Sequence, residues 1–208
     1  MKTQNLITLI MVAFFTVATF GQGITNSAHD FSQKTWNSNS QEICNVCHTP
    51  HEAVTGLTAP LWNHEVTTQT FTLYTSTVSP SFNATASQPG GSSKLCLSCH
   101  DGITKVDNFG GVTNGTKTIG GSKNLGTDLS NDHPVSFVYD AALATADGGL
   151  HNPTTVNSGL GGTIDGDLLL GTRMECSSCH DVHDAAGLNS ILVKGNIGSA
   201  LCLTCHNK

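Results

Sequence analysis

The stretch Cys44-Asn45-Val46-Cys47-His48-Thr49-Pro50-His51 places two cysteines and a histidine within five residues, with a second histidine three positions later. Its Cys-x-x-Cys-His part occurs four times, and the 208-residue chain has no cysteine outside these motifs. The four motifs are Cys44-Cys47-His48, Cys96-Cys99-His100, Cys176-Cys179-His180 and Cys202-Cys205-His206.

This spacing is the attachment signature of c-type haem. The two thiols form thioethers with the vinyl groups of one haem, and the adjacent histidine then ligates the iron from one side. We therefore predict four covalently bound haem c groups. The eight cysteines are the expected attachment sites, and His48, His100, His180 and His206 are the expected proximal iron ligands.

Other uses of paired cysteines explain the pattern less well. Zinc sites also contain Cys-x-x-Cys pairs, and thioredoxin-like redox sites contain one such pair. Neither needs a histidine directly after every pair. Disulfides between neighbouring pairs remain the other alternative for an exported chain, but they leave the four histidines unexplained.

The first residues predict export. A positive charge at Lys2 precedes an apolar run from Leu6 to Phe20, and small residues follow, as in a secretory signal peptide. We expect residues 1–23 to be the signal peptide and residues 24–208 to be the exported tetrahaem domain. A retained anchor is the alternative, although the run is short for a membrane span of roughly 20 residues. No other segment approaches that length, so we expect no membrane span in the mature chain.

Charge and composition narrow the partners and the fold class. The formal net charge is -6, and no basic cluster is present, so we expect no nucleic acid partner. Only 12% of the residues are charged and 6% are aromatic, which gives little material for an ordinary core. We expect a mostly irregular chain with short helices and few short strands, organised around a row of four haems. Residues 71–74 and 135–139 are the expected strands, helical turns are expected after the motifs, and glycine pairs mark turns.

Each iron needs a sixth ligand, and the sequence favours histidine for it. Six histidines lie outside the motifs, namely His29, His51, His64, His133, His151 and His183. Of the three methionines, two fall in the expected signal peptide, and Met174 lies too near Cys176 to cross its haem. With bis-histidine ligation no iron keeps an open face for a substrate, so we expect an electron carrier rather than an enzyme.

His51 cannot ligate the same iron as His48. Axial imidazoles lie on opposite faces of the ring, which separates their Cα atoms by on the order of 12 Å, whereas three residues span at most about 11 Å. We therefore expect His51 to reach a different haem, and His183 obeys the same constraint relative to His180; the alternative for each is a surface histidine after a turn. Each of these histidines would bring a second haem close to the first.

The motifs also form an internal repeat, with units at about 24–102 and 128–208. Each unit contains two motifs and needs two distal ligands, for which we predict His29 and His51 in the first unit and His133 and His183 in the second. Following chain order, we assign His29 to the first haem, His51 to the second, His133 to the third and His183 to the fourth. His64 and His151 are alternates, with His151 more typical of a loop.

Several segments together resemble a known family. They are Cys44–His51, Leu95–Gly102, Asp128–Val135 with its His133-Pro134 pair, Cys176–His183 and Leu61-Trp62-Asn63. Their order resembles the doubled Cys-x-x-Cys-His multihaem cytochromes, and is similar to that of the tetrahaem filament cytochromes, over nearly all of the mature chain. The resemblance implies secreted subunits that stack head to tail into extracellular filaments with a continuous haem chain.

In that family one subunit can lend a histidine to a haem of its neighbour, and His29 would be the natural candidate here. The implied function is extracellular electron transfer at the cell surface. The implied partners are further copies of the chain, other redox proteins and extracellular electron acceptors. Two alternatives remain at this point: a discrete periplasmic electron carrier and, less favoured, a multihaem reductase.

Overall fold

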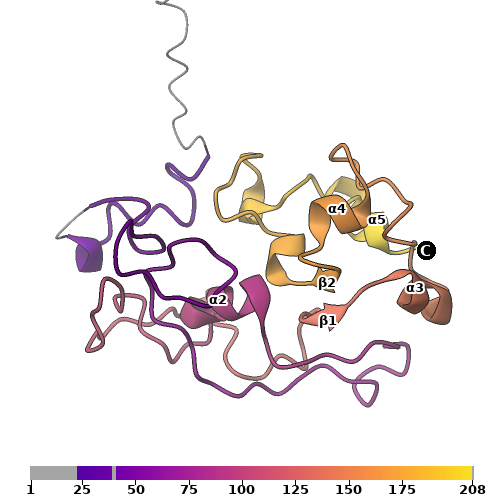
Figure 1. The fold of residues 1–208 in the computed structure, drawn as a ribbon, viewed down its shortest axis with the longest axis horizontal. Helices are drawn as coiled ribbons and strands as arrows, with labels where there is room; N and C mark the ends of the chain where they lie inside the picture. Colours follow the sequence, from indigo (N-terminus) through magenta and orange to yellow (C-terminus); the bar gives the residue numbers. More distant parts are fainter. Residues whose placement is uncertain (1–22, 39–40, 208) are drawn as a thin grey trace, which may run out of the picture.

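The fold was analysed in a computed structural model, which describes residues 23–38 and 41–207. The expected signal peptide therefore lies outside the described residues, apart from Gly23. Most of the described chain is irregular, which confirms the expected fold class (Figure 1). The α-helices are α2 (Gly91–His100), α3 (Ala141–Asp147), α4 (Ile164–Leu168) and α5 (Cys202–Cys205), and the strands are β1 (Phe137–Val138) and β2 (Arg173–Met174). Short 3-10 turns are η1 (Thr35–Asn37), η2 (Gly121–Lys123), η3 (Cys176–Ser178), η4 (Asn189–Ile191) and η5 (Ile197–Ser199).

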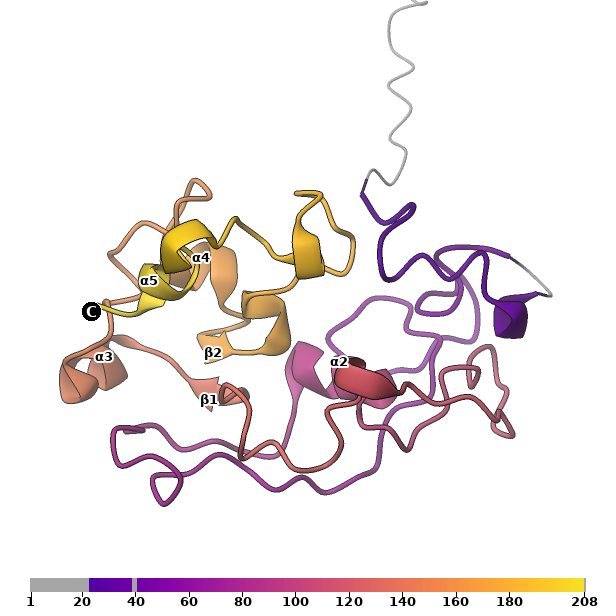
Figure 2. The same cartoon turned by 180° about the vertical axis from the view of Figure 1, so that it is seen from behind.

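The molecule is elongated, and the two halves of the sequence lie toward opposite ends of its long axis (Figure 1). The view from behind shows the same separation (Figure 2). The segment before α2 is an exception, because it runs beneath the second half, where Phe82 packs edge-on against Phe137 at 5.6 Å. Within the described residues, no helix is long and apolar enough to cross a membrane.

Helical turns contain the haem-attachment motifs rather than following them. Cys96, Cys99 and His100 lie within α2, and the last motif forms α5. The expectation of helices after the motifs is therefore wrong. A helix suits the motif because residues three and four positions apart share one face, so both thiols and the imidazole can meet one haem.

The second half contains the larger apolar cluster. Strand β1 pairs antiparallel with β2, with Phe137 opposite Met174. The cluster around this pair consists of Phe137, Tyr139, Ala144, Ile164, Leu168 and Met174. A smaller cluster consists of Phe71, Leu97 and Leu129, with Leu73 packed against it. The strand expected at residues 71–74 is reduced to one bridge between Thr72 and Asp128.

Aspartate and glycine define the two ends of α3. The Asp140 carboxylate accepts a hydrogen bond from Leu143 N, which satisfies a free amide of the first turn. Gly148 ends the helix with φ of 71°, a left-handed conformation that costs glycine little. The glycine pair at this position therefore forms the expected turn.

Candidate haem-binding sites

The four motifs share one local conformation. In three of them the backbone N–H of the histidine donates to the carbonyl of the first cysteine, at 2.8 Å for His48, 3.0 Å for His180 and 2.9 Å for His206. The motif of His100 lies within the regular helix α2. This single helical turn presents the two cysteines and the histidine of each motif on one side of the backbone.

Backbone carbonyls orient the proximal imidazoles. His48 Nδ1 donates to Pro60 O at 2.8 Å, and His100 Nδ1 donates to Lys123 O at 2.7 Å. His180 Nδ1 donates to Ser190 O at 2.9 Å. A carbonyl can only accept, so Nδ1 carries the proton in each case and Nε2 keeps its lone pair. That tautomer is the one needed for a metal bond through Nε2.

Three of the proximal histidines each face one further histidine. The ring centres are 6.3 Å apart for His48 and His183, 6.2 Å for His100 and His29, and 6.3 Å for His206 and His133. An iron–nitrogen bond of about 2 Å, with about 1.2 Å from nitrogen to ring centre, would separate the ring centres of two axial imidazoles by about 6.4 Å. The residues present thus fit a haem iron held between two imidazoles at three sites.

The pairing expected from chain order is wrong. His29 faces the second proximal histidine, His100, rather than the first. His183 faces His48 of the first motif rather than a ligand of the fourth. His133 faces His206, not His180. His29 and His133 therefore each face the second proximal histidine of their own unit, whereas His183 faces a proximal histidine of the other unit.

His29 is suited to ligation because it is uncharged at neutral pH. Burial, together with the nearby imidazoles of His100 and His180, lowers the pKa of its imidazole to about 4. A neutral imidazole offers a lone pair to a metal without first losing a proton.

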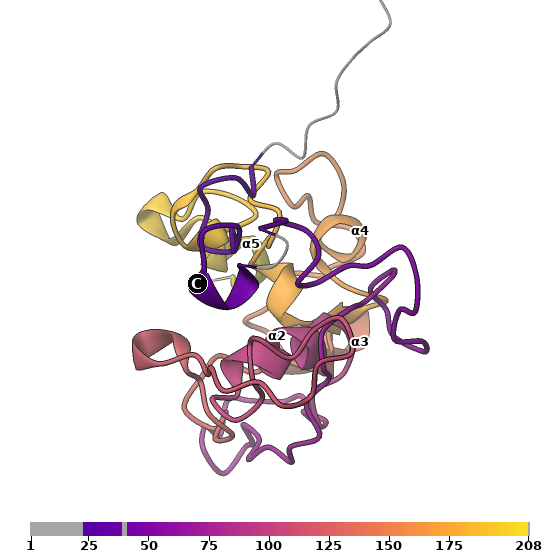
Figure 3. The same ribbon diagram turned by 90° about the vertical axis from the view of Figure 1, so that its left-hand side faces the viewer.

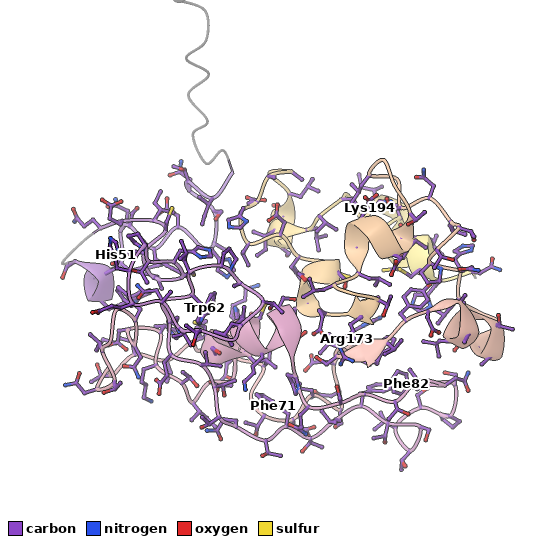
Figure 4. All side chains as sticks on the ribbon, viewed as in Figure 1. His51, Trp62, Phe71, Phe82, Arg173 and Lys194 are labelled. Atoms are coloured by element: carbon purple, nitrogen blue, oxygen red, sulfur yellow. The ribbon has the colours of Figure 1, made fainter. Side chains whose placement is uncertain are left out.

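His180 and His51 are the two predicted ligands that face no other ring in the part of the chain that the structure describes. His180 is oriented by Ser190, as described above, yet no imidazole lies opposite it. His51 is exposed and lies in the half of the molecule away from α5 (Figure 4). The chain thus has one proximal histidine and one distal histidine left over.

His64 and His151 occupy positions that differ from those of the paired rings. His64 is 1% exposed, its Nδ1 donates to Glu65 O at 2.7 Å, and its Nε2 lies 3.5 Å from Cys99 Sγ. It therefore lies at the attachment side of the second motif rather than opposite His100. His151 lies in a loop, where its backbone N–H donates to Cys205 O at 2.8 Å.

The cysteines connect the motifs in sequence order. The thiols of Cys96 and Cys176 hydrogen-bond to each other, which brings the second motif against the third. The thiols of Cys47 and Cys99 are close enough to interact electrostatically, and so are the thiols of Cys179 and Cys205. Each motif therefore lies close to the next along the chain.

The eight cysteines form no disulfide in the described structure, and burial makes two of their thiols poor nucleophiles. All eight cysteines are free. Burial raises the pKa of Cys47 to about 11 and that of Cys205 to about 11, so both are poor nucleophiles at neutral pH. Within residues 23–38 and 41–207, no three Cys, His, Asp or Glu side chains converge as ligands of a bare metal ion.

Asp101, directly after His100, is a site residue that the sequence did not indicate. Its buried carboxylate accepts from the hydroxyls of Thr67 and Thr104, both at 2.7 Å, and from the backbone N–H of Ile103 and Thr104, both at 2.8 Å. Burial acts to raise the pKa of Asp101, but these four hydrogen bonds outweigh it and hold the pKa below its usual range. The only sequence signal was its place after the motif, because the partner threonines are far apart in the chain.

Comparison with known proteins agrees with this chemistry. Residues 171–208 match the family model of the doubled CXXCH motif, which covers the third and fourth motifs. No curated protein matches the chain. The motifs indicate covalently bound haem c, and the match supports a multihaem c-type cytochrome that functions in electron transfer.

Proposed function

We propose that this chain is a secreted tetrahaem cytochrome that conducts electrons outside the cell as a head-to-tail filament. The observation that carries this function is the pair of leftover ligands, His180 and His51. Among residues 23–38 and 41–207, His180 has the orientation of a proximal ligand but no imidazole opposite it, and His51 is exposed without a ring partner. One copy can therefore supply the ligand that the next copy lacks.

The chain's own residues would hold four haems. The ligand sets are His48 with His183, His100 with His29, His206 with His133, and His180 with His51 of a second copy. When bound, each haem supplies a one-electron iron couple, and bis-histidine ligation gives a lower potential than histidine–methionine ligation. The protein residues orient the imidazoles, exclude water from buried sites such as that of His29, and keep successive motifs adjacent.

The shared ligand favours a filament over a closed ring. His51 lies in the first unit and His180 in the second, so the shared ligand joins two different surfaces of the subunit. A contact between two different surfaces is heterologous, and it continues indefinitely unless its rotation closes. His29, the bridging candidate implied by the family resemblance, is not free for that role because its ring faces His100.

Two other functions predict different behaviour. A discrete periplasmic carrier would leave the iron at His180 with one imidazole or take a ligand from elsewhere. A reductase would use that same open face for a substrate. Electron transfer along a row of haems needs no catalytic site. Of the three functions, only the filament gives the exposed His51 a role.

Electron microscopy of the secreted, mature protein tests the proposed function. We expect filaments from the wild type and from His151→Ala, a matched loss of a loop imidazole. We expect isolated particles from His51→Ala, with a mass that still includes four haem additions. Wild-type protein that stays as isolated particles at all concentrations would contradict the filament.

A further inference from the structure

The two units of the repeat match residue by residue around their motifs. Residues 43–53 correspond to 175–185, residues 60–64 to 190–194, and residues 91–100 to 197–206. The backbone confirms this correspondence, because equivalent hydrogen bonds recur in both units. They are Thr49 N to Leu61 O and Asp181 N to Ile191 O, Asn63 N to Cys47 O and Val193 N to Cys179 O, and Ser98 Oγ to Lys94 O and Thr204 Oγ1 to Ala200 O.

Inside the chain, the second motif of the first unit packs on the first motif of the second unit. Ser93 Oγ accepts from Cys176 N at 2.9 Å, and the hydroxyls of Ser92 and Ser177 are 2.6 Å apart. The end-on view shows α2 and the chain around η3 next to each other (Figure 3). This internal junction, residues 91–96 against residues 175–179, also brings Cys96 to Cys176.

A small residue is required where the two units meet. A β-carbon at Gly91 would lie 3.3 Å from the buried Glu175 carboxylate, and Gly91 has φ of 47°. Glu175 is held there by Ser136 Oγ at 2.8 Å and by Arg173 Nε at 3.2 Å. The internal junction is therefore polar and closely packed.

The counterpart of this junction is uncovered at each end of the chain. Ile197, which corresponds to Gly91, is 95% exposed. Cys202 and Cys44, which correspond to Cys96 and Cys176, are both exposed. Covering Ile197 by another copy would remove its apolar surface from water and so would favour association.

The local backbone is also less regular where the partner is missing. Helix α2 begins at Gly91 and is supported by the hydroxyl contacts of the internal junction. In the second unit, regular helix begins only at Cys202, and the preceding turn has left-handed φ values of 62° at Gly198 and 63° at Ser199. Ser199, the counterpart of Ser93, therefore lacks the contact that orders α2.

We propose that residues 197–202 of one copy dock on residues 43–47 of the next copy, as residues 91–96 dock on 175–179 within the chain. Ser199 Oγ would then accept from Cys44 N, and Cys202 would lie beside Cys44. Ile197 meets the half-buried Ile43, which corresponds to Glu175, so an apolar pair replaces the polar contact inside the chain. This interface presupposes the head-to-tail filament proposed above.

The same operation satisfies the leftover ligands. Within the chain, His183 of the second unit faces His48, the first proximal histidine of the preceding unit. Its counterpart His51 would face His180, the first proximal histidine of the unit that precedes it in the filament. If one copy packs on the next as the first unit packs on the second, the same arrangement covers the apolar pair and supplies the shared ligand.

Substitution and cross-linking test the interface in the mature, haem-loaded protein. We expect Ile197→Asp and Ile43→Asp each to raise the concentration needed for filament assembly at least tenfold. Val78→Asp, at a position 50% exposed and outside both docking segments, should leave assembly unchanged. Four haem additions by mass and an unaltered absorption spectrum in isolated chains show that the Ile197 variant is folded.

A photoreactive phenylalanine at position 197 locates the contact directly. In a mixture of isotopically labelled and unlabelled copies, we expect it to cross-link to residues 41–47 of another copy. Filaments that form normally with both isoleucine variants, or cross-links to other segments, would overturn the interface while leaving the filament itself intact. Wild-type chains that do not assemble would instead overturn the proposed function, so the two failures are distinguishable.

Discussion

His51 and His183 occupy the same position in two nearly identical turns, yet they have different surroundings. In both turns the backbone N–H donates to the side chain two residues earlier, at 3.4 Å to Thr49 Oγ1 and at 2.9 Å to Asp181 Oδ1. His183 then stacks against His48 with its ring plane inclined by 18°. His51 has no such partner among the described residues.

The difference shows how a repeat generates open ends. Each unit supplies the distal ligand of its own second motif, through His29 or His133, and reaches back to the unit before it through His51 or His183. With two units in one chain, His183 meets a proximal histidine of the preceding unit, but His51 does not. Repeats of this kind bury their unfinished surfaces by adding neighbours, either within a chain or between chains.

The largest expected effect comes from removing one member of the compared pair. In isolated chains, His183→Ala should add one five-coordinate haem, about a quarter of the total, because the iron at His48 loses its second imidazole. His51→Ala should add none, since His51 has no partner within its own chain. The high-spin fraction in the absorption spectrum measures both variants. Equal increases in the two variants would break the comparison.

The next effect concerns the larger apolar cluster, which surrounds β1 and β2 in the second unit. Ile164 is 0% exposed in that cluster, so Ile164→Ala should lower the free energy of unfolding by about 3 kcal/mol. Chemical denaturation followed by absorbance measures the loss. Val138→Ala, at a position 45% exposed, should change stability by less than about 0.5 kcal/mol. A similar cost for both would show that the cluster does not support the second unit.

Asp101 and Asn207 follow the second proximal histidine of each unit and sharpen the comparison further. Asp101→Asn should cost about 2 kcal/mol, because an amide cannot accept all four hydrogen bonds that the buried carboxylate receives. Asn207 is exposed, so Asn207→Asp should be nearly neutral. The same denaturation measurement compares them, and a larger loss in the Asn207 variant would contradict the assignment.

The smallest expected effect concerns α3, which has no counterpart in the first unit. Gly148→Ala should cost about 1 kcal/mol, because alanine is strained at the left-handed φ of 71° that ends the helix. Gly120 has φ of -126° and open space around its β-position, so Gly120→Ala is the matched control. Thermal unfolding resolves the difference, and an unchanged midpoint for Gly148→Ala would contradict it.

The sequence predicted attachment chemistry better than it predicted pairing. The spacing of Cys, Cys and His depends on a single helical turn, so the four motifs and the irregular fold were accessible from the chain alone. His183 faces His48 because of the way the second unit packs on α2. No local sequence pattern encodes that packing. The same applies to the carbonyls of Pro60, Lys123 and Ser190, which any residue could have supplied.

The most direct measurement is the number of carbon monoxide molecules that the reduced protein binds before and after assembly. A five-coordinate haem iron binds this ligand readily, whereas one held by two imidazoles does not. We predict one molecule per chain in dilute monomers, none in filaments, and one at every concentration for His51→Ala. Monomers that bind none, or filaments that still bind one per chain, would contradict the claim that each copy completes the haem site of its neighbour.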